Sequence, residues 1–319
     1  MAPERLASTA TKLSSHSIRI GHSGLMPTPT TMKNEHRDMS QETTLITGAS
    51  SGIGLELARE FARHRHPLIL VAPVESELQT VRNQIQREFG VSVTTIAADL
   101  TDPEAAEHIF DTVENGGLTV DVLVNNAGVG QRGKSWEIPL EKDLEMIRLN
   151  IEAVIRLTKY FLPPMVERGR GRILNTASVA GFEPGPMLAV YHATKAFILS
   201  WSEAIATELE DTGVSVTALC PGPVDTDFFP KADMVATMAF QKANVMSPQE
   251  VAQVGHEAAM KGERVIIPGA LNKVMITSRR LIGESIQARK NEKMYEDVSL
   301  EDMKRQSGDI REKAAAKGK

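Results

Sequence analysis

The sequence predicts one α/β domain with a doubly wound parallel sheet of about seven strands and helices on both faces. Two patterns support this prediction. Short, almost continuously apolar segments, typical of strands buried on both faces, alternate along residues 42–284 with longer segments whose apolar residues recur every three or four positions. Each helix then joins two parallel strands by a right-handed crossover, so the carboxyl ends of the strands, where ligands of such sheets bind, share one edge.

The expected strands are rich in β-branched residues and are bounded by Gly, Pro, Asn or Asp, as strands usually are. They are Thr43–Thr47, Leu68–Ala72, Val91–Ala97, Val120–Val124, Arg172–Thr176, Val214–Leu219 and Val265–Ile267. Helical spacing is clearest in two sets of apolar residues: Leu55, Leu57, Ala58, Phe61 and Ala62, then Leu78, Val81, Ile85 and Phe89. A later helix is expected to start near Ser247.

The two ends of the 319-residue chain differ from its middle. Residues 1–41 are rich in Ser, Thr, Met and His and lack sustained apolar periodicity, so we expect a disordered N-terminal extension. A transit peptide is the alternative, because the early part of this extension is basic. Residues 285–319 carry dense mixed charge and are expected to form a solvated helix or loose tail. The 243 residues between them, 42–284, fit one domain.

Composition argues against several classes of function. The 36 basic and 41 acidic side chains give a net charge of −5, which offers no broad electrostatic reason to bind nucleic acid. No apolar run approaches the roughly 18–20 residues that span a bilayer. The single cysteine, Cys220, excludes an internal disulfide and favours a reducing compartment such as the cytoplasm. We expect no metal site, since His64 and His66 stand among arginines at a helix end, where a solvated terminus is favoured.

The first strand leads into a glycine-rich turn, Thr47–Gly54, that directly precedes a helix. Its three glycines lack a Cβ, so the backbone can turn tightly and approach a pyrophosphate, and the helix offers its positive dipole end to the same anion. Its two serines can add hydrogen bonds, and its isoleucine should anchor the turn in the core. These residues are Gly48, Ser50, Ser51, Gly52, Ile53 and Gly54. Taken alone, the motif also fits a plain tight turn.

Four more motifs follow the later strands. Asn125-Asn126-Ala127-Gly128 follows the fourth strand, Ser178 follows the fifth, Tyr191-x-x-x-Lys195 lies on the next helix, and Pro221-Gly222 follows the sixth strand. With the glycine turn, they make residues 42–284 resemble the short-chain dehydrogenase/reductases. The resemblance implies a Rossmann-type fold, an NAD or NADP cofactor, interconversion of a carbonyl compound and an alcohol, and a homodimer or homotetramer.

Tyr191 and Lys195 are four residues apart and therefore share one face of a helix. A tyrosine with an ordinary pKa of about 10 is a poor acid–base group at neutral pH unless its phenolate is stabilised. An ammonium one turn away is expected to lower the pKa of the phenol. The resemblance makes Tyr191 the general acid/base and lets Lys195 also bind the nicotinamide ribose. It implies that Ser178 orients the substrate oxygen and that Asn150 helps to hold a water near the lysine.

The resemblance places the other cofactor contacts in the loops after the third, fourth and sixth strands. They are Asp99, Asn126, Ala127, Gly128, Pro221, Gly222 and Thr226, together with Tyr191 and Lys195. Asp99 is expected to bond the adenine amino group, and Thr226 to contact the nicotinamide side of the cofactor. In the competing interpretation, Asp99 or Asp102 caps the helix that opens at Pro103.

The second strand departs from the family pattern. Members that prefer NAD usually end this strand with an aspartate, and members that prefer NADP often place an arginine just after it. Here the strand ends at Ala72 and continues Pro73-Val74-Glu75, so neither residue is present. The missing acid removes repulsion of a 2′-phosphate, which favours NADP. Alternatively, Glu75 reaches the ribose and favours NAD.

Residues 225–247 are expected to form a lid over the substrate, because flexible thioethers and aromatic rings suit an apolar pocket. The side chains concerned are Phe228, Phe229, Met234, Met238, Phe240 and Met246, with Phe182, Met187 and Leu188 added to the wall. Packing in the core or in a dimer contact is the alternative for several of them. A basic amphipathic segment between Leu271 and Ile282 is expected to pack on the domain or a partner subunit rather than on a membrane.

Two classes of function therefore compete. The favoured one is an NAD(P)-dependent oxidoreductase, with NADP preferred, that acts on a small carbonyl compound or alcohol of apolar character. The alternative is a non-enzymatic dinucleotide-binding regulator on the same fold. The complete set of Asn150, Ser178, Tyr191 and Lys195 favours the enzyme, because a protein that only binds a dinucleotide has little need of an activated phenol.

Overall fold

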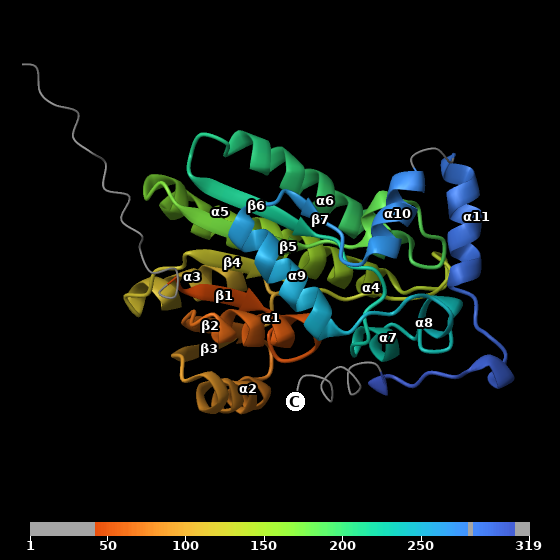
Figure 1. Ribbon diagram of the computed structural model, residues 1–319, viewed down its shortest axis with the longest axis horizontal. Helices are drawn as coiled ribbons and strands as arrows, with labels where there is room; N and C mark the ends of the chain where they lie inside the picture. The colour runs from red at the N-terminus through yellow and green to blue at the C-terminus, as the bar shows by residue number, and fades with distance from the viewer. Residues whose placement is uncertain (1–41, 280–282, 310–319) are drawn as a thin grey trace, which may run out of the picture. The chain divides into compact units, whose positions relative to one another are not determined.

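The computed structural model describes residues 42–279 and 283–309, and within them it contains one seven-stranded parallel sheet in the order β3-β2-β1-β4-β5-β6-β7 (Figure 1). The strands are β1 Thr44–Thr47, β2 Leu68–Ala72, β3 Val93–Ala97, β4 Val122–Asn125, β5 Gly171–Thr176, β6 Val214–Leu219 and β7 Val265–Ile266. All seven predicted strands are confirmed within two residues at each end. The fold class, a Rossmann-type parallel sheet, is confirmed with them.

Eleven α-helices are described, together with a π-helix, Arg148–Glu152, between the fourth and fifth. They are α1 Gly52–Arg63, α2 Glu75–Phe89, α3 Ala105–Asn115, α4 Leu140–Ile147, α5 Ala153–Glu167, α6 Ala189–Glu208, α7 Phe228–Lys231, α8 Met238–Gln241, α9 Pro248–Lys261, α10 Ala270–Arg279 and α11 Glu284–Met294. Helices α1, α2 and α9 pack on one face of the sheet, and α3, α5 and α6 pack on the other (Figure 1).

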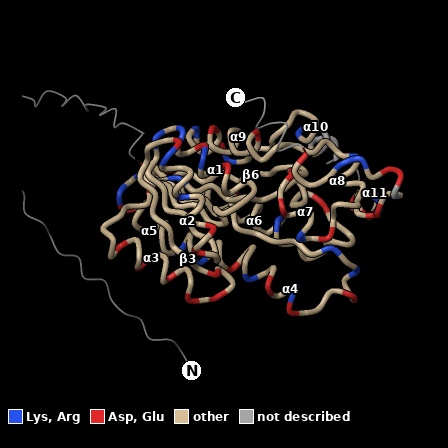
Figure 2. Tube along the Cα trace, turned by 90° about the horizontal axis from the view of Figure 1, so that it is seen from below, with Lys and Arg blue, Asp and Glu red and all other residues tan. Residues whose placement is uncertain are grey.

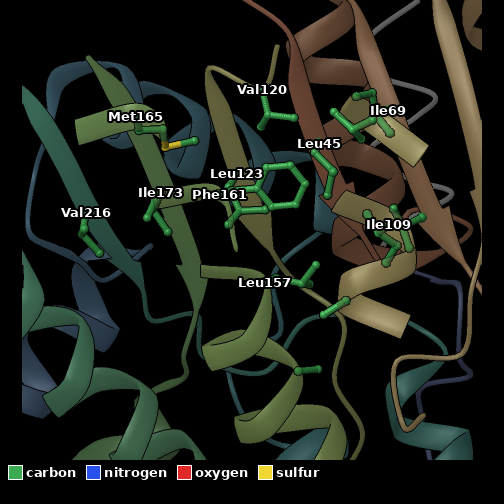
Figure 3. Packing of buried hydrophobic residues seen from close by; sticks show 14 of the residues in the cluster. Leu45, Ile69, Ile109, Val120, Leu123, Leu157, Phe161, Met165, Ile173 and Val216 are labelled. Atoms are coloured by element: carbon green, nitrogen blue, oxygen red, sulfur yellow. The ribbon is translucent and has the colours of Figure 1, made fainter. Parts of the chain in front are cut away.

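The hydrophobic core consists of two layers, one on each face of the sheet. Phe161 of α5 packs on the face that carries Leu123 of β4, and both side chains are at most 3% exposed (Figure 3). On the other face, Leu57 of α1 packs in a cluster with Leu70 of β2 and Val251 of α9. The central strands β2 and β4 are buried at every position, whereas the edge strand β3 also has exposed residues.

Helix α9 begins where the sequence predicts. Ser247 is its N-cap, its hydroxyl accepts a hydrogen bond from the backbone N–H of Glu250, and the Glu250 carboxylate accepts one from the backbone N–H of Ser247. This reciprocal pair satisfies two N–H groups that a helix start otherwise leaves free. Pro248 occupies the first turn, where a missing N–H costs nothing.

The charged C-terminal region differs from the expected solvated helix or loose tail. Residues after α11 bond to the segment between β6 and α9: Val298 N–H donates to Ala236 O at 2.9 Å, and Gly308 N–H donates to the Asp225 carboxylate at 2.8 Å. The side chain of Gln241 accepts from the backbone N–H of Arg305 at 2.9 Å. Non-local backbone bonds of this kind leave no periodic signature in a sequence, which explains the difference. The expectations for residues 1–41 and 310–319 lie outside the described residues.

Charged side chains of both signs are interspersed along the described chain (Figure 2). No described helix is long and apolar enough to cross a membrane. In α10, Leu271 and Val274 are 68% and 65% exposed, so these two do not pack on the domain. Residues 280–282 of that predicted segment lie outside the described residues. At the end of α1, the side chain of His64 is half exposed, as expected for a solvated helix terminus. The side chain of His66 is buried, so the same prediction was wrong for that residue.

Candidate active site

The glycine turn after β1 has the close-packed shape that the motif predicts. Gly48 and Gly52 adopt φ values of +65° and +58°, in the left-handed region that favours glycine. A Cβ placed on Gly54 would lie 2.1 Å from the Gly48 carbonyl oxygen and 2.5 Å from Asn126 Nδ2, so no side chain fits there. The turn therefore presents bare backbone at the N-terminus of α1, where unpaired N–H groups favour an anion.

Asn126 and Thr47 hold the turn against the loop after β4. Asn126 Nδ2 donates to Thr47 O at 3.0 Å, and the Thr47 hydroxyl accepts from the backbone N–H groups of Asn126 and Ala127 at 3.0 and 3.1 Å. Ser51 is the N-cap of α1, and its hydroxyl makes no capping hydrogen bond to the helix. The Ser51 hydroxyl thus remains available to a ligand at the helix N-terminus. Thr226 packs against Gly52 from the loop after β6.

Tyr191, Ser178 and Lys195 meet at the carboxyl edge of the sheet. The Ser178 side chain is hydrogen-bonded to Tyr191, and it also donates to Pro221 O at 3.4 Å. Lys195 is 5% exposed and donates from Nζ to Thr176 O at 2.8 Å. A Cβ on Gly128 would lie 3.4 Å from Lys195 Nζ, so the ammonium reaches the loop after β4. The structure therefore brings the predicted catalytic set and the glycine-rich loops to one edge.

The pKa values of the pair differ from the expectation. Burial raises the pKa of Tyr191 to about 12, and the hydrogen bond from Ser178 opposes this shift only in part. Burial also lowers the pKa of Lys195 to about 8. The expected lowering of the phenol pKa by Lys195 is not found, since a lysine with a pKa of about 8 is already neutral at the pH where a phenol with a pKa of about 12 loses its proton. Lys195 Nζ is hydrogen-bonded to Thr176 O and lies 5.8 Å from the centre of the Tyr191 ring. In the free protein the phenol thus keeps its proton at neutral pH.

Asn150 lies in the π-helix Arg148–Glu152 and is 1% exposed. Its Oδ1 accepts from Val129 N–H at 2.9 Å, while its Nδ2 donates to Val129 O at 2.9 Å and to the Thr194 hydroxyl at 3.1 Å. Single-turn π-helices occur often at functional sites. The side chain of Asn150 thereby fixes the loop that carries Gly128 to the helix that carries Tyr191 and Lys195. Its expected role in holding a water stays a prediction.

Comparison with known proteins identifies the family. The short chain dehydrogenase family matches residues 42–235. The chain belongs to the short chain dehydrogenases. It is 38% identical over 191 residues to 1-deoxy-11-beta-hydroxypentalenate dehydrogenase of Streptomyces exfoliatus, covering 59% of this chain and 69% of that protein. It is 31% identical over 245 residues to the very-long-chain 3-oxoacyl-CoA reductase of Rattus norvegicus, covering 73% of this chain and 75% of that protein.

Solved structures agree with this assignment. A short-chain dehydrogenase from Sphingobium yanoikuyae in complex with NADPH has 33% identity and a TM-score of 0.68, with 75% of this chain and 94% of that chain covered. A 7beta-hydroxysteroid dehydrogenase has 28% identity and a TM-score of 0.70, with 78% of this chain and 96% of that chain covered. As a short chain dehydrogenase, the protein is an oxidoreductase that binds NAD or NADP, and these findings favour it over a non-enzymatic regulator.

Asp99, which the resemblance predicts to bond the adenine amino group, is exposed in the loop after β3. Its Oδ1 accepts from Thr101 N–H at 3.0 Å and from the Thr101 hydroxyl at 2.8 Å. Helix α3 starts later than expected, with Glu104 as N-cap, and Asp102 Oδ1 accepts from Glu104 N–H at 2.9 Å. Asp99 therefore shapes the loop rather than capping the helix, and its contact with adenine stays a prediction.

The turn after β2 lacks both residues by which short chain dehydrogenases usually select a cofactor. Pro73 and Val74 are exposed, and α2 starts at Glu75. The Glu75 carboxylate accepts hydrogen bonds from Gln79 Nε2 at 2.5 Å and from the Thr95 hydroxyl at 3.5 Å. These contacts engage Glu75 at the start of its own helix, where an acid also suits the helix dipole.

The predicted lid supplies fewer pocket residues than expected. Phe229, Met234 and Phe240 are at most 4% exposed and form a hydrophobic cluster of their own with Leu188. Phe228 instead lies beside Tyr191, with 5.2 Å between the ring centres. Met246 packs against the core layer on the α1 face, and Phe182 packs against a cluster beneath α6. Phe229, Met234 and Phe240 behave as core because the segment is long enough to bury a small core of its own.

Two residues of the site region escaped the sequence analysis, Tyr295 and Arg132. The Tyr295 hydroxyl lies 2.8 Å from Nε2 of His192, the neighbour of Tyr191, and Nδ1 of the same ring lies 2.8 Å from Glu183 O. Arg132 donates to both oxygens of Asp297, at 2.9 and 3.2 Å. Both contacts join residues more than a hundred positions apart in the chain, so no local sequence motif could have predicted them.

Proposed function

We propose that the protein reduces an apolar ketone with NADPH, with Tyr191 as the proton donor. The observation that carries the proposal is the meeting of Tyr191, Ser178 and Lys195 beside the glycine-lined loops. The backbone at Gly48, Gly52 and Gly54 fits a pyrophosphate, because a Cβ at Gly54 would fill the cradle. A bound nicotinamide supplies or accepts the hydride.

The roles of the side chains follow from their protonation. A phenol with a pKa raised to about 12 holds its proton at Oη in the free protein, as a donor to a developing alkoxide must. Ser178 bonds the phenol and is proposed to orient the carbonyl oxygen on the same side. Lys195, with a pKa lowered to about 8, is still charged at neutral pH and is proposed to bind the nicotinamide ribose. A Lys195 ammonium that turned from Thr176 O toward the ribose site would favour the phenolate of Tyr191 by its charge.

The NADP preference is proposed from the turn after β2. An acid at the end of this strand repels a 2′-phosphate, and the strand ends in Ala72 and Pro73 instead. Glu75, the nearest carboxylate in sequence, is engaged by Gln79 and Thr95. Related structures also hold NADPH or an NADP derivative. We further propose that Asp99, Asn126, Ala127, Pro221, Gly222 and Thr226 line the cofactor site.

We propose an apolar substrate because the apolar ring of Phe228 lies beside the proposed proton donor. The centre of this ring is 5.2 Å from the centre of the Tyr191 ring, and the ring packs over Gly130. Related proteins are named for bulky apolar substrates, among them a hydroxysteroid and a very-long-chain 3-oxoacyl-CoA. A homodimer or homotetramer is proposed because α6 leaves Phe197 39% exposed. A reducing compartment such as the cytoplasm suits a chain whose cysteine, Cys220, is a buried free thiol.

The test compares the wild type with Tyr191→Phe on a panel of ketones, with NADPH and NADH titrated by fluorescence. We expect Tyr191→Phe to lower kcat by at least about a hundredfold, the usual contribution of a general acid, while cofactor affinity changes little. Tyr160→Phe is the matched control, because Tyr160 is a partly buried tyrosine on α5 that stacks on Phe110 away from the site. Retained turnover in Tyr191→Phe would refute the assignment of the proton donor.

A further inference from the structure

A second cluster of polar side chains lies between α1 and α9, away from the catalytic edge. One ligand atom from each of Glu60, His64 and His256 lies within 4.8 Å of the others. Glu60 comes eight residues after Gly52, which places it about 12 Å further along the axis of α1 than the start of the helix. The cluster is therefore separate from the proposed cofactor site.

His256 is the unusual member of this cluster. It is 5% exposed, and neither of its ring nitrogens has a hydrogen-bond partner among the residues that the structure describes. The ring of Phe61 packs edge-on against the ring of His256, with 4.7 Å between the ring centres, and the ring of His64 stacks on it with 4.1 Å between the ring centres. Buried polar groups almost always have a partner, so two unpaired nitrogens on one buried ring call for a ligand.

The other two members provide suitable donors beside His256. Glu60 is 7% exposed, and its carboxylate accepts from Arg63 and lies 3.6 Å from His64 Nδ1. His64 Nδ1 also lies 3.0 Å from the backbone oxygen of Glu60. With Nδ1–H donating there, Nε2 keeps the lone pair, as in histidines whose second nitrogen is held while the first binds a metal. His66 is outside the set, because its Nδ1 is engaged by Glu42 O at 2.8 Å.

We propose that Glu60, His64 and His256 bind one divalent transition-metal ion of the Zn²⁺ type. Two imidazoles and one carboxylate form a common zinc set that leaves a fourth position for water. Nitrogen donors argue against Mg²⁺ and Ca²⁺, which prefer oxygen. The site lies at the end of α1 that is remote from the glycine turn, so the ion stabilises the packing of α1 on α9 and takes no part in turnover.

Binding requires two local changes. The rings of His64 and His256 are stacked at an interplanar angle of 20°, whereas lone pairs that share an ion converge in the ring planes, so the His64 ring must turn. The His64 side chain is 48% exposed, which gives it room to turn and gives the ion a path from solvent. Arg63 must also release Glu60, and its side chain is 57% exposed.

The experiment titrates Zn²⁺ into the metal-free, full-length protein and follows both calorimetric binding and Tm. Three further histidines, at positions 16, 22 and 36, precede the described residues, so the readout is the difference between variants. His64→Ala is the main test, because this half-exposed side chain can be removed with little cost to folding. His108→Ala, an exposed histidine on α3, is the matched control.

We expect the wild type and His108→Ala to bind one Zn²⁺ that raises Tm, and His64→Ala and His256→Asn to lose at least about tenfold in affinity, with NADPH affinity unchanged throughout. Arg63→Ala should tighten binding severalfold, because it frees the Glu60 carboxylate. Equal Zn²⁺ affinity and equal Tm shifts in His64→Ala, His256→Asn and His108→Ala would overturn the proposal. An unchanged affinity in Arg63→Ala would remove Glu60 from the ligand set.

Discussion

The substitution Gly54→Ala tests whether the close-packed turn after β1 is what holds the cofactor. The added Cβ would lie 2.1 Å from Gly48 O and 2.5 Å from Asn126 Nδ2, so the turn and the Asn126 side chain must both move. Overpacking costs about 1–3 kcal/mol, and loss of the 3.0 Å bond from Asn126 to Thr47 O costs about 1 kcal/mol more. Alanine recovers about 1 kcal/mol over glycine inside a helix. The net loss is then about 1–3 kcal/mol.

A loss of this size should lower Tm by about 3–10 °C in a domain of this length. NADPH affinity should fall at least about tenfold, because each charge-assisted hydrogen bond from the displaced backbone is worth about 1.5–3 kcal/mol. Thermal unfolding and fluorescence titration measure the two effects. Gly283→Ala is the control, since a Cβ at Gly283 meets no atom of the described residues within 4 Å and its φ is −60°. Wild-type Tm and affinity in Gly54→Ala would refute the reasoning.

Three further predictions concern charge. Val74→Arg should raise the affinity for NADPH over NADH about twofold to fivefold, the effect of an exposed ion pair of roughly 0.5–1 kcal/mol, and an equal gain in Val74→Gln would exclude charge as its cause. NADPH affinity should fall as the pH rises through about 8, where Lys195 loses its proton, and Lys195→Met should show low affinity without this pH dependence. Burial lowers the pKa of His256 to about 3, so its contribution to stability is complete above the ordinary value of 6.5 and is lost as the pH falls toward 3. We therefore expect the free energy of unfolding, measured with denaturant in the presence of a chelator, to fall between pH 6.5 and 5 by roughly 1.5 kcal/mol more in the wild type than in His256→Phe. Equal decreases in the two proteins would contradict this.

Local features of the fold were predictable from the sequence. The segment Leu68–Ala72 reads as a strand because both faces of a central strand are covered, and the structure buries all five residues. The glycine turn was predictable for a similar reason, since the positive φ of Gly48 and Gly52 restricts those positions to glycine. The burial of a strand and the backbone conformation of a tight turn both constrain residues that are close together in the sequence, so both leave a local pattern.

The electrostatics of the site were not predictable in the same way. The spacing of Tyr191 and Lys195 correctly placed them one helical turn apart, but it did not reveal that Thr176 O would take the ammonium. The direction of the shift in the phenol pKa is set by burial, which arises from the tertiary structure. The buried His256 was missed likewise, because α1 and α9 are brought together only by the completed sheet.

The motifs supply the residues proposed for the chemistry, and we propose that the part of the chain that carries no motif selects the substrate. The family match ends at residue 235, yet the ring of Tyr295 bonds His192, which is adjacent to Tyr191 in the chain. Because His192 Nδ1 is held by Glu183 O, Nε2 is left to accept from the Tyr295 hydroxyl, and the C-terminal segment is thereby fixed beside α6. Arg132 secures the same segment through Asp297. Relatives that share the catalytic set but differ after residue 235 should therefore differ in substrate rather than in reaction.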